Sequence, residues 1–307
     1  MTTKCERDCD TPTAARRNGG SKPVLKKLSI RLDKYDASID FNSWTVTVKL
    51  RGKTFKLKLL HRRSYLEKFR GRKWYEVIVK WLPGTRIEVV IPFRFNYEPY
   101  QPRRVLALDL NLKTITLYDG GNVRRLKTRC PEALRLKHLA EEVQKRHPYS
   151  WRRNSRLLDL VRSLHKRSAR IVLGWSRKIA KYLVLKAEKM SAAIAVENLD
   201  KLWHNASQKS SSLADRLSRF AYRKLVQAIE AKAVEYNVPL VYVDPRNTSK
   251  TCPRCGARLH YQHRLAICPR CRFKADRDTV GAMNIWLRAV QAHAPRPRVA
   301  GHPPDDR

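Results

Sequence analysis

The chain has 307 residues and contains 66 Lys and Arg against 27 Asp and Glu, which gives a formal net charge of +39. A charge excess of this size is tolerated mainly when a polyanion screens it, so an ordinary metabolic enzyme is excluded as the default and a nucleic-acid partner is expected. The 42% hydrophobic content excludes a wholly disordered basic tail, because it is enough to build a core.

Two further classes are excluded by the apolar segments. Residues Met1–Lys22 lack the apolar stretch of a secretory signal. No segment approaches the roughly 18 uncharged apolar residues of a membrane span. We therefore expect an intracellular, cytoplasmic and nucleoid-associated protein with no membrane partner, most simply a monomer.

The N-terminal third is expected to be rich in strands. Residues 1–24 have no hydrophobic period and are interpreted as a disordered basic arm. Between Val24 and Tyr97, apolar residues alternate with polar ones and turn signals separate the runs, which predicts a small antiparallel sheet or barrel. Its outward positions are repeatedly basic: Lys49, Lys53, Lys56, Lys58, Arg62, Arg63 and Lys80. These side chains suit contact with phosphates. Alternatively, they only protect strand edges from aggregation.

The middle of the chain reads as strands followed by long helices. The apolar run Val105–Leu108 predicts a strand that ends at Asp109, and Ile115–Tyr118 predicts a second strand before a hairpin turn. Residues Pro131–Met190 have helical periodicity with a break near His147. Their polar face is dense in Lys and Arg, so we expect contact with a polyanion rather than internal ion pairs.

The C-terminal part alternates short strands and helices. Ala192–Val196 predicts a strand ending at Glu197, Leu213–Tyr236 an amphipathic helix, and Pro239–Val243 another strand. A short helix is predicted over Thr279–Val290. The remaining residues, 291–307, are proline-rich and are expected to be disordered.

The cysteines form the strongest single motif. Two C-x-x-C pairs are separated by twelve residues, with Pro after the first Cys of each pair: Cys252, Cys255, Cys268 and Cys271. Four thiolates at this spacing are typical of one tetrahedral structural Zn²⁺ with no open position. His260 and His263 are expected at the surface, and Cys5, Cys9 and Cys130 remain as ordinary thiols.

Acidic residues are scarce, so their positions matter. Asp109 and Glu197 each end an apolar strand, and Asp276 and Asp278 precede the last helix. Carboxylates that converge at one sheet edge form a divalent-metal site, and two Mg²⁺ ions are the usual apparatus of phosphodiester hydrolysis. The alternative is that each acid is a helix cap or a surface residue, and Asp278 is well placed as an N-cap.

Four sequence blocks belong together: Leu106–Lys113 (LALDLNLK), Val196–Leu199 (VENL), Asn247–Gly256 (NTSKTCPRCG) and Asp276–Ile285 (DRDTVGAMNI). In order and separation they resemble the TnpB family of transposon-encoded, RNA-guided DNA endonucleases, which is related to the compact type V CRISPR effectors. The resemblance covers roughly residues 40–290 and is most specific over 240–285.

The resemblance implies a fold and a site. The fold is α/β, with an RNase H-like (RuvC) nuclease domain at 101–290, a zinc ribbon inserted at 248–275, and a shortened β-rich, wedge-like barrel at 25–100 that binds nucleic acid. Asp109, Glu197 and Asp278 match the family's catalytic, magnesium-binding triad, with Asp276 in support. The zinc ligands match Cys252, Cys255, Cys268 and Cys271.

The sequence also departs from the family pattern. Ala107 and Asn111 replace the Gly residues that flank the first acid, Val280 replaces an Asn, and Arg272 replaces the Gly after the second cysteine pair. The space before residue 105 is too short for the family's helical recognition segment.

Two functions follow as expectations. The first is an RNA-guided, Mg²⁺-dependent DNA endonuclease from a transposable element, with guide RNA and target DNA as partners and a two-metal mechanism. The alternative is a shortened homologue that binds RNA or DNA with little or no cleavage. Transposase activity in its own right is less favoured, because no candidate Tyr or His-x-His site is evident.

Overall fold

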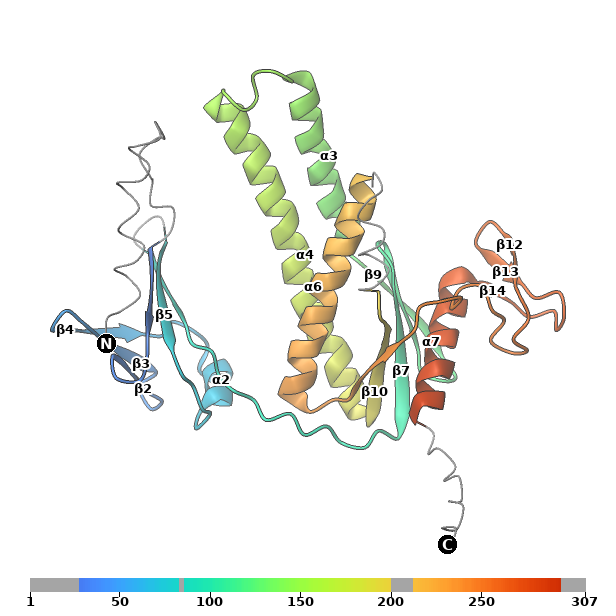
Figure 1. Ribbon diagram of the computed structural model, residues 1–307, viewed down its shortest axis with the longest axis horizontal. Coiled ribbons are helices and arrows are strands. Elements are labelled where there is room, and N and C mark those ends of the chain that lie inside the picture. The colour runs from blue at the N-terminus through green and yellow to red at the C-terminus, as the bar shows by residue number, and fades with distance from the viewer. Residues whose placement is uncertain (1–27, 83–85, 200–211, 294–307) are drawn as a thin grey trace, which may run out of the picture. The chain divides into compact units, whose positions relative to one another are not determined.

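The computed structural model describes residues 28–82, 86–199 and 212–293 (Figure 1). The expected disordered arm at 1–24, most of the expected tail at 291–307, and Cys5 and Cys9 lie outside the described residues. Contacts divide the chain into two compact units that meet between Asn96 and Tyr97. Each unit is described by itself.

The first unit contains two antiparallel three-stranded sheets. One has the order β1–β5–β6, from Leu28–Leu32, Val77–Leu82 and Arg86–Val90. The other has the order β2–β3–β4, from Ala37–Asp40, Thr45–Leu50 and Lys53–Lys58. Their inward residues share one core, made by Leu32, Ala37, Val46, Val48 and Val77.

The first unit differs from the sequence expectation in two respects. Among its described strands the two sheets are not joined into a closed barrel, because each hairpin pairs only within its own sheet. The stretch expected to contain only strands also includes the short helix α2 (Arg63–Leu66) and the 3-10 turn η1 (Glu67–Phe69). These elements follow a run of exposed polar residues, where the strand alternation is lost.

The second unit is built on a five-stranded mixed sheet with the order β11–β10–β7–β8–β9. The hairpin strands are β7 (Arg104–Leu110), β8 (Thr114–Tyr118) and β9 (Val123–Lys127). Strands β10 (Ala192–Glu197) and β11 (Leu240–Val243) run parallel to β7. The expected strands in this region are confirmed, with bounds shifted by a residue or so.

Helices cover both faces of this sheet. Helices α4 (Ser155–Lys189) and α6 (Leu213–Tyr236) pack on one face, over a core that includes Leu106, Leu108 and Ile194. Helix α7 (Arg277–His293) packs on the other face, where Ile285 and Ala289 meet Val105 and Ala107. Alternate residues of β7 therefore face opposite helical layers.

Helix α3 (Cys130–Arg146) packs along α4 and α6, and the predicted helical break falls between α3 and α4. Asn154 caps α4 by accepting hydrogen bonds from the backbone amides of Arg156 and Leu157. Ser212 and Asp215 form a capping box at the start of α6. Within the described residues, no helix is long and apolar enough to cross a membrane.

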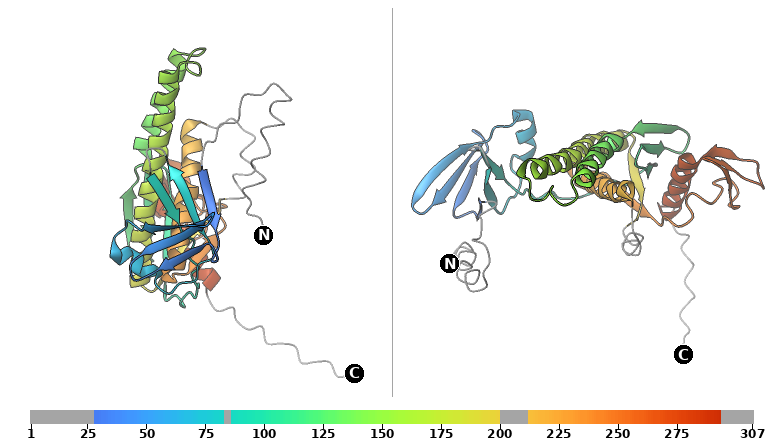
Figure 2. Two further views of the ribbon diagram at one scale, coloured as in Figure 1. Left: turned by 90° about the vertical axis from the view of Figure 1, so that its left-hand side faces the viewer. Right: turned by 90° about the horizontal axis from the view of Figure 1, so that it is seen from above.

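A small three-stranded sheet lies between β11 and α7 in the sequence, with strands β12 (His260–Gln262), β13 (Leu265–Ile267) and β14 (Lys274–Asp276). Its side chains pack on α7 through Val280 and Met283. Figure 2 shows the resulting order of layers in this unit: α4 and α6, the five-stranded sheet, α7, and then the small sheet.

Candidate metal centres

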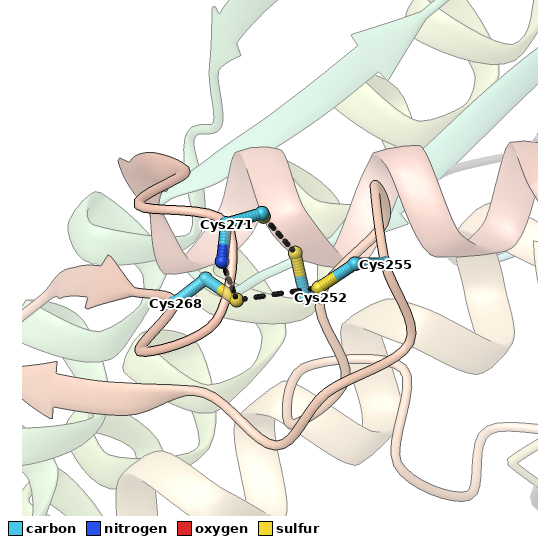
Figure 3. Close-up of side chains that lie close together, drawn as sticks. All are labelled: Cys252, Cys255, Cys268 and Cys271. Carbon is cyan, nitrogen blue, oxygen red and sulfur yellow. Dashed lines mark hydrogen bonds between the residues drawn. The ribbon is translucent and has the colours of Figure 1, made fainter.

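Four cysteine side chains converge in the small sheet (Figure 3). The Sγ atoms of Cys252, Cys255, Cys268 and Cys271 all lie within 4.8 Å of one another. The closest pairs are Cys255 with Cys268 at 3.4 Å and Cys252 with Cys271 at 3.5 Å. This cluster can bind a zinc ion, because four thiolates at about 2.3 Å from one centre form the usual structural site.

The surroundings of the cluster shift the pKa values of its thiols in opposite directions: burial and the neighbouring thiols raise the pKa of Cys271 to about 12. The backbone amide of Cys271 lies 3.5 Å from Cys268 Sγ and lowers the pKa of the Cys268 thiol to about 6. Turns with left-handed residues, Gly256 and Arg272, follow the two C-x-x-C pairs. Arg272 therefore adopts the conformation for which Gly is the usual residue. His260 and His263 are exposed, as expected.

The three candidate carboxylates meet on the α7 face of the large sheet. Leu108 of β7 pairs with Val196 of the parallel strand β10, so Asp109 and Glu197 are the next residues on neighbouring strands. By the alternation of side chains, both acids share the face of Ala107 and Ala195, which pack toward α7. Helix α7 brings Asp278 to this face in its first turn.

Asp109 lies directly against the start of α7. A Cβ atom added to Gly281 would be 3.1 Å from Asp109 Oδ2, so the absence of a side chain at this position permits the approach. The side-chain amide of Asn111 donates a hydrogen bond of 2.9 Å to the same Oδ2 atom. Asn111, which stands where the resembled family has Gly, thus orients the carboxylate.

Glu197 is held from the loop that follows β11. The hydroxyl of Thr248, which is buried, donates a 2.6 Å hydrogen bond to Glu197 Oε1. Thr248 is itself fixed, because the side-chain amide of Asn284 in α7 donates to its carbonyl at 2.6 Å. The Tyr222 hydroxyl donates to the Glu197 backbone carbonyl.

Two arginines from different elements contact Asp276, and one of them also contacts Asp278. Arg264, in the turn between β12 and β13, donates to Asp278 Oδ2 at 2.5 Å and lies 3.3 Å from Asp276. Arg125 of β9 lies 2.9 Å from Asp276. Asp276 Oδ1 accepts from the Asp278 amide at 3.0 Å. Asp276 therefore satisfies the first turn of α7, and the interpretation of Asp278 as its N-cap is wrong.

The carboxylates influence one another electrostatically. Burial, together with the neighbouring Glu197 and Asp278 carboxylates, raises the pKa of Asp109 to about 7. Burial also raises the pKa of Glu197, against the hydrogen bond from Thr248. Closely placed, desolvated acids of this kind require a cation to be stable in their charged form.

The donor set fits hard divalent cations. Carboxylate oxygens are the ligands that Mg²⁺ prefers, whereas the thiolate cluster suits zinc. Among the described residues, the four cysteines form a group of possible ligands whose atoms all lie within 4.8 Å of one another. The three carboxylates do not form such a group, so their oxygen atoms are spread more widely.

Several residues at this site were not expected from the sequence. Thr248, Arg264, Gly281 and Asn284 are far from their partners along the chain, so no local pattern signals them. Thr248, Gly281 and Asn284 do lie inside the quoted blocks. Arg264 is outside them and carries no sequence signal that we can identify.

Comparison with known proteins identifies the family of the chain. Residues 222–285 match the model of the Cas12f1-like TNB domain. TnpB-like protein MJ0751 of Methanocaldococcus jannaschii is 29% identical over 75% of this chain and 84% of that protein. The chain belongs to the TnpB family.

Other relatives of this TnpB-family protein are CRISPR-associated. Endodeoxyribonuclease Cas12f2 from a Micrarchaeota archaeon is 29% identical over 44% of this chain and 28% of its own length. The cryo-EM structure of a Cas12f1–sgRNA–target DNA complex superposes with a TM-score of 0.55 at 14% identity, covering 91% of this chain and 69% of that one. This likeness shows a shared mixed α/β fold.

Proposed function

We propose that this protein is an RNA-guided DNA endonuclease encoded by a transposable element, and that Asp109, Glu197 and Asp278 hold its catalytic Mg²⁺ ions. The observation that carries the proposal is the register of β7 and β10, which places Asp109 and Glu197 side by side on the face that α7 covers. An acid from each of three elements is thereby directed to one place.

The topology supports a nuclease domain of the RNase H (RuvC) type. The resemblance implies a mixed sheet flanked by helices, with the acids at strand ends. The sheet order β9–β8–β7–β10–β11, with β10 and β11 parallel to β7, has this form. We assign residues 101–290 to the domain, with the zinc ribbon at 248–275.

The proposed chemistry is hydrolysis of a phosphodiester bond. Bound Mg²⁺ ions supply an activated water and stabilise the leaving oxygen. The protein positions the carboxylates: Asn111 fixes Asp109, Thr248 fixes Glu197, and the Asp276 side chain orders the backbone at Asp278. Arg264 lies against Asp278 and provides positive charge beside the site.

The proposed partners are guide RNA and target DNA. The net charge of +39 is large enough for an extended polyanion, and the curated relatives include CRISPR-associated endodeoxyribonucleases. In RNA-guided systems, base pairing reads sequence while the protein contacts backbone and a short flanking motif. We assign the β-rich residues 25–100 to nucleic-acid binding.

A direct experiment tests the proposal. The protein is purified with its co-expressed RNA, that RNA is sequenced, and cleavage of a matched DNA target is measured with Mg²⁺. Asp109→Asn is expected to reduce the cleavage rate by at least a hundredfold, as loss of a metal ligand does. The matched control is Asp244→Asn, which removes an exposed acid just after β11 and should leave the rate unchanged. Equal cleavage by wild type and Asp109→Asn would overturn the assigned site.

The alternative of a binding protein with little cleavage has one specific observation in its favour. In the described part of the first unit, helix is limited to α2 and η1, which are four and three residues long. A helical segment for target recognition is therefore not found among residues 28–82 and 86–96. Tight binding of RNA and matched DNA without cleavage in Mg²⁺ would favour this second function.

A further inference from the structure

An aromatic groove lies within the first unit. A cavity of about 550 Å³ is lined by fifteen residues. Five of them are Phe, Tyr or Trp: Trp44, Tyr65, Phe69, Phe93 and Phe95. We call this cavity the aromatic groove. All of its lining residues lie between Ile39 and Phe95, so it is complete within one compact unit.

The rings are arranged in a connected series. His61 stacks on Tyr65 with centroids 4.2 Å apart and an angle of 29° between the planes. Tyr65 meets Phe69 edge-on at 5.2 Å, and Phe69 stacks on Phe93 at 4.8 Å and 29°. Rings stacked in this way each use one face within the series, and an exposed ring at the edge of the series keeps an outer face of the kind on which a nucleobase stacks.

The series is not simply a closed core. Tyr65 remains 43% exposed, and Ile87 and Leu60, which also line the groove, are 45% and 93% exposed. The buried core residues Val46, Val48 and Val77 do not line the groove, whereas its inner wall, formed by Ile39, Leu59, Val89 and Ile91, packs against that core. Large apolar groups that stay exposed around a hollow indicate a binding surface rather than packing.

The charges around the aromatic groove are positive. Lys58 lines it, and no Asp or Glu is among its described lining residues. Exposed Arg62 and Arg63 follow His61 in the chain. Arg72 stacks over Phe95 at 4.1 Å. The nearby acid Glu67 pairs with Arg70 at 2.7 Å and with Arg63 at 3.5 Å, so it offsets part of the positive charge of these two arginines but does not pair with Arg62 or Arg72.

We propose that the aromatic groove is a stacking site for unpaired bases of a single-stranded nucleic acid, with Tyr65 as the outer stacking residue and the surrounding cations on the flanking phosphates. Aromatic faces beside positive charge are the general means of binding single strands without reading their sequence. The inference rests on the proposed function, which supplies nucleic acid as the partner. It adds a place and a mode of contact.

The test separates bases from phosphates. Fluorescence anisotropy measures binding of the full chain to a labelled oligothymidylate of about twelve nucleotides and to an abasic strand of equal length, which has the same charge but no bases. Wild type is expected to bind the oligothymidylate about tenfold more tightly, because each stacked base adds that order of affinity. Tyr65→Leu should remove most of this preference.

Two further variants control for folding and for aromatic content. Tyr65→Phe keeps the ring and should keep the preference. Tyr35→Leu removes a tyrosine of the same unit that is 88% exposed and outside the groove, and should also keep it. The salt dependence of binding should be the same in all variants, since the phosphate contacts are unchanged.

The outcomes are distinguishable. Equal binding of the two strands by wild type, or an undiminished preference in a folded Tyr65→Leu variant, would overturn the stacking site while leaving nucleic-acid binding intact. If wild type bound neither strand at low salt, the proposed function itself would be in error.

Discussion

The five-stranded sheet and the cysteine module, which is the β12–β14 sheet together with Cys252, Cys255, Cys268 and Cys271, pack against the same helix, α7, but we expect them to be stabilised in different ways. The sheet shares with α4 and α6 a core of fifteen buried residues, among them Leu106, Leu108 and Ile194. The cysteine module has strands of three residues each, and two of the five buried residues that it contributes to its core with α7 are the cysteines Cys252 and Cys268.

The difference between the two cores indicates which interactions stabilise each region. Burial of apolar surface is sufficient for the sheet, at roughly 25 cal/mol per Å². A unit as small as the cysteine module buries too little apolar surface to fold alone, so we expect a metal bound by the four cysteines to supply the remainder. The two regions should therefore respond oppositely to metal removal and to core truncation.

Removal of zinc is the largest expected effect. Structural zinc sites contribute on the order of 10–16 kcal/mol of apparent binding free energy at neutral pH. A strong chelator, or Cys268→Ala, should abolish hydrogen-exchange protection at residues 260–276 and leave protection at 105–110 nearly intact. Cys130→Ala is the matched control, because Cys130 is also buried but lies in α3. Protected amides in a zinc-free module would contradict the comparison.

Truncation of a side chain in the core of the five-stranded sheet is the next largest expected effect. Leu108 is fully buried between β7 and the α4–α6 layer, so Leu108→Ala should lower the free energy of unfolding by about 2–5 kcal/mol. Urea denaturation measures this loss, and a zinc titration should give unchanged affinity. Leu160→Ala removes a leucine that is 45% exposed and should change the stability by no more than about 0.5 kcal/mol.

A smaller change tests the position where α7 approaches the carboxylates. In Gly281→Ala the new methyl would lie 3.1 Å from Asp109 Oδ2, so either the helix or the acid must shift by a few tenths of an ångström. Under the proposed function, cleavage should slow by about tenfold while the fold is kept. Gly174→Ala in α4 meets nothing within 4 Å and should instead stabilise the protein by about 0.5–1 kcal/mol.

The smallest expected effect concerns a surface ion pair that links the two regions. Arg125 of β9 and Asp276 of β14 are 48% and 26% exposed, so Arg125→Gln should cost at most about 1 kcal/mol in urea denaturation. The cost should shrink in high salt, because screening weakens the exposed pair. A loss well above this value, independent of salt, would mean that the module depends on this contact more than on metal.

The large sheet and its helices were predictable because their patterns are local. Apolar runs ending at Asp109 and Glu197 identified β7 and β10, and the amphipathic period over Leu213–Tyr236 gave α6 with its observed bounds. The helical break near His147 was found as well. In each case the signal lies within a few residues of the element that it predicts.

The supporting contacts of the candidate site were not predictable, for the opposite reason. Thr248 donates to Glu197, which is 51 positions away in the sequence, and Thr114 lies 164 positions from Asp278. Such pairs are created by the packing of β11 and α7 on the sheet. Similarly, the two sheets of the first unit could not be distinguished from a barrel, because alternation fixes a strand's faces but not its neighbours.

The two faces of α7 have a consequence for changes in chain length. Val280 and Met283 point into the cysteine module, whereas Ile285 and Ala289 point into the sheet core. Each helical residue turns the chain by about 100°, so one residue inserted between Met283 and Ile285 would rotate every later side chain away from its core. Substitutions in α7 can be absorbed one contact at a time, but an insertion or deletion would uncouple the cysteine module from the five-stranded sheet in a single step.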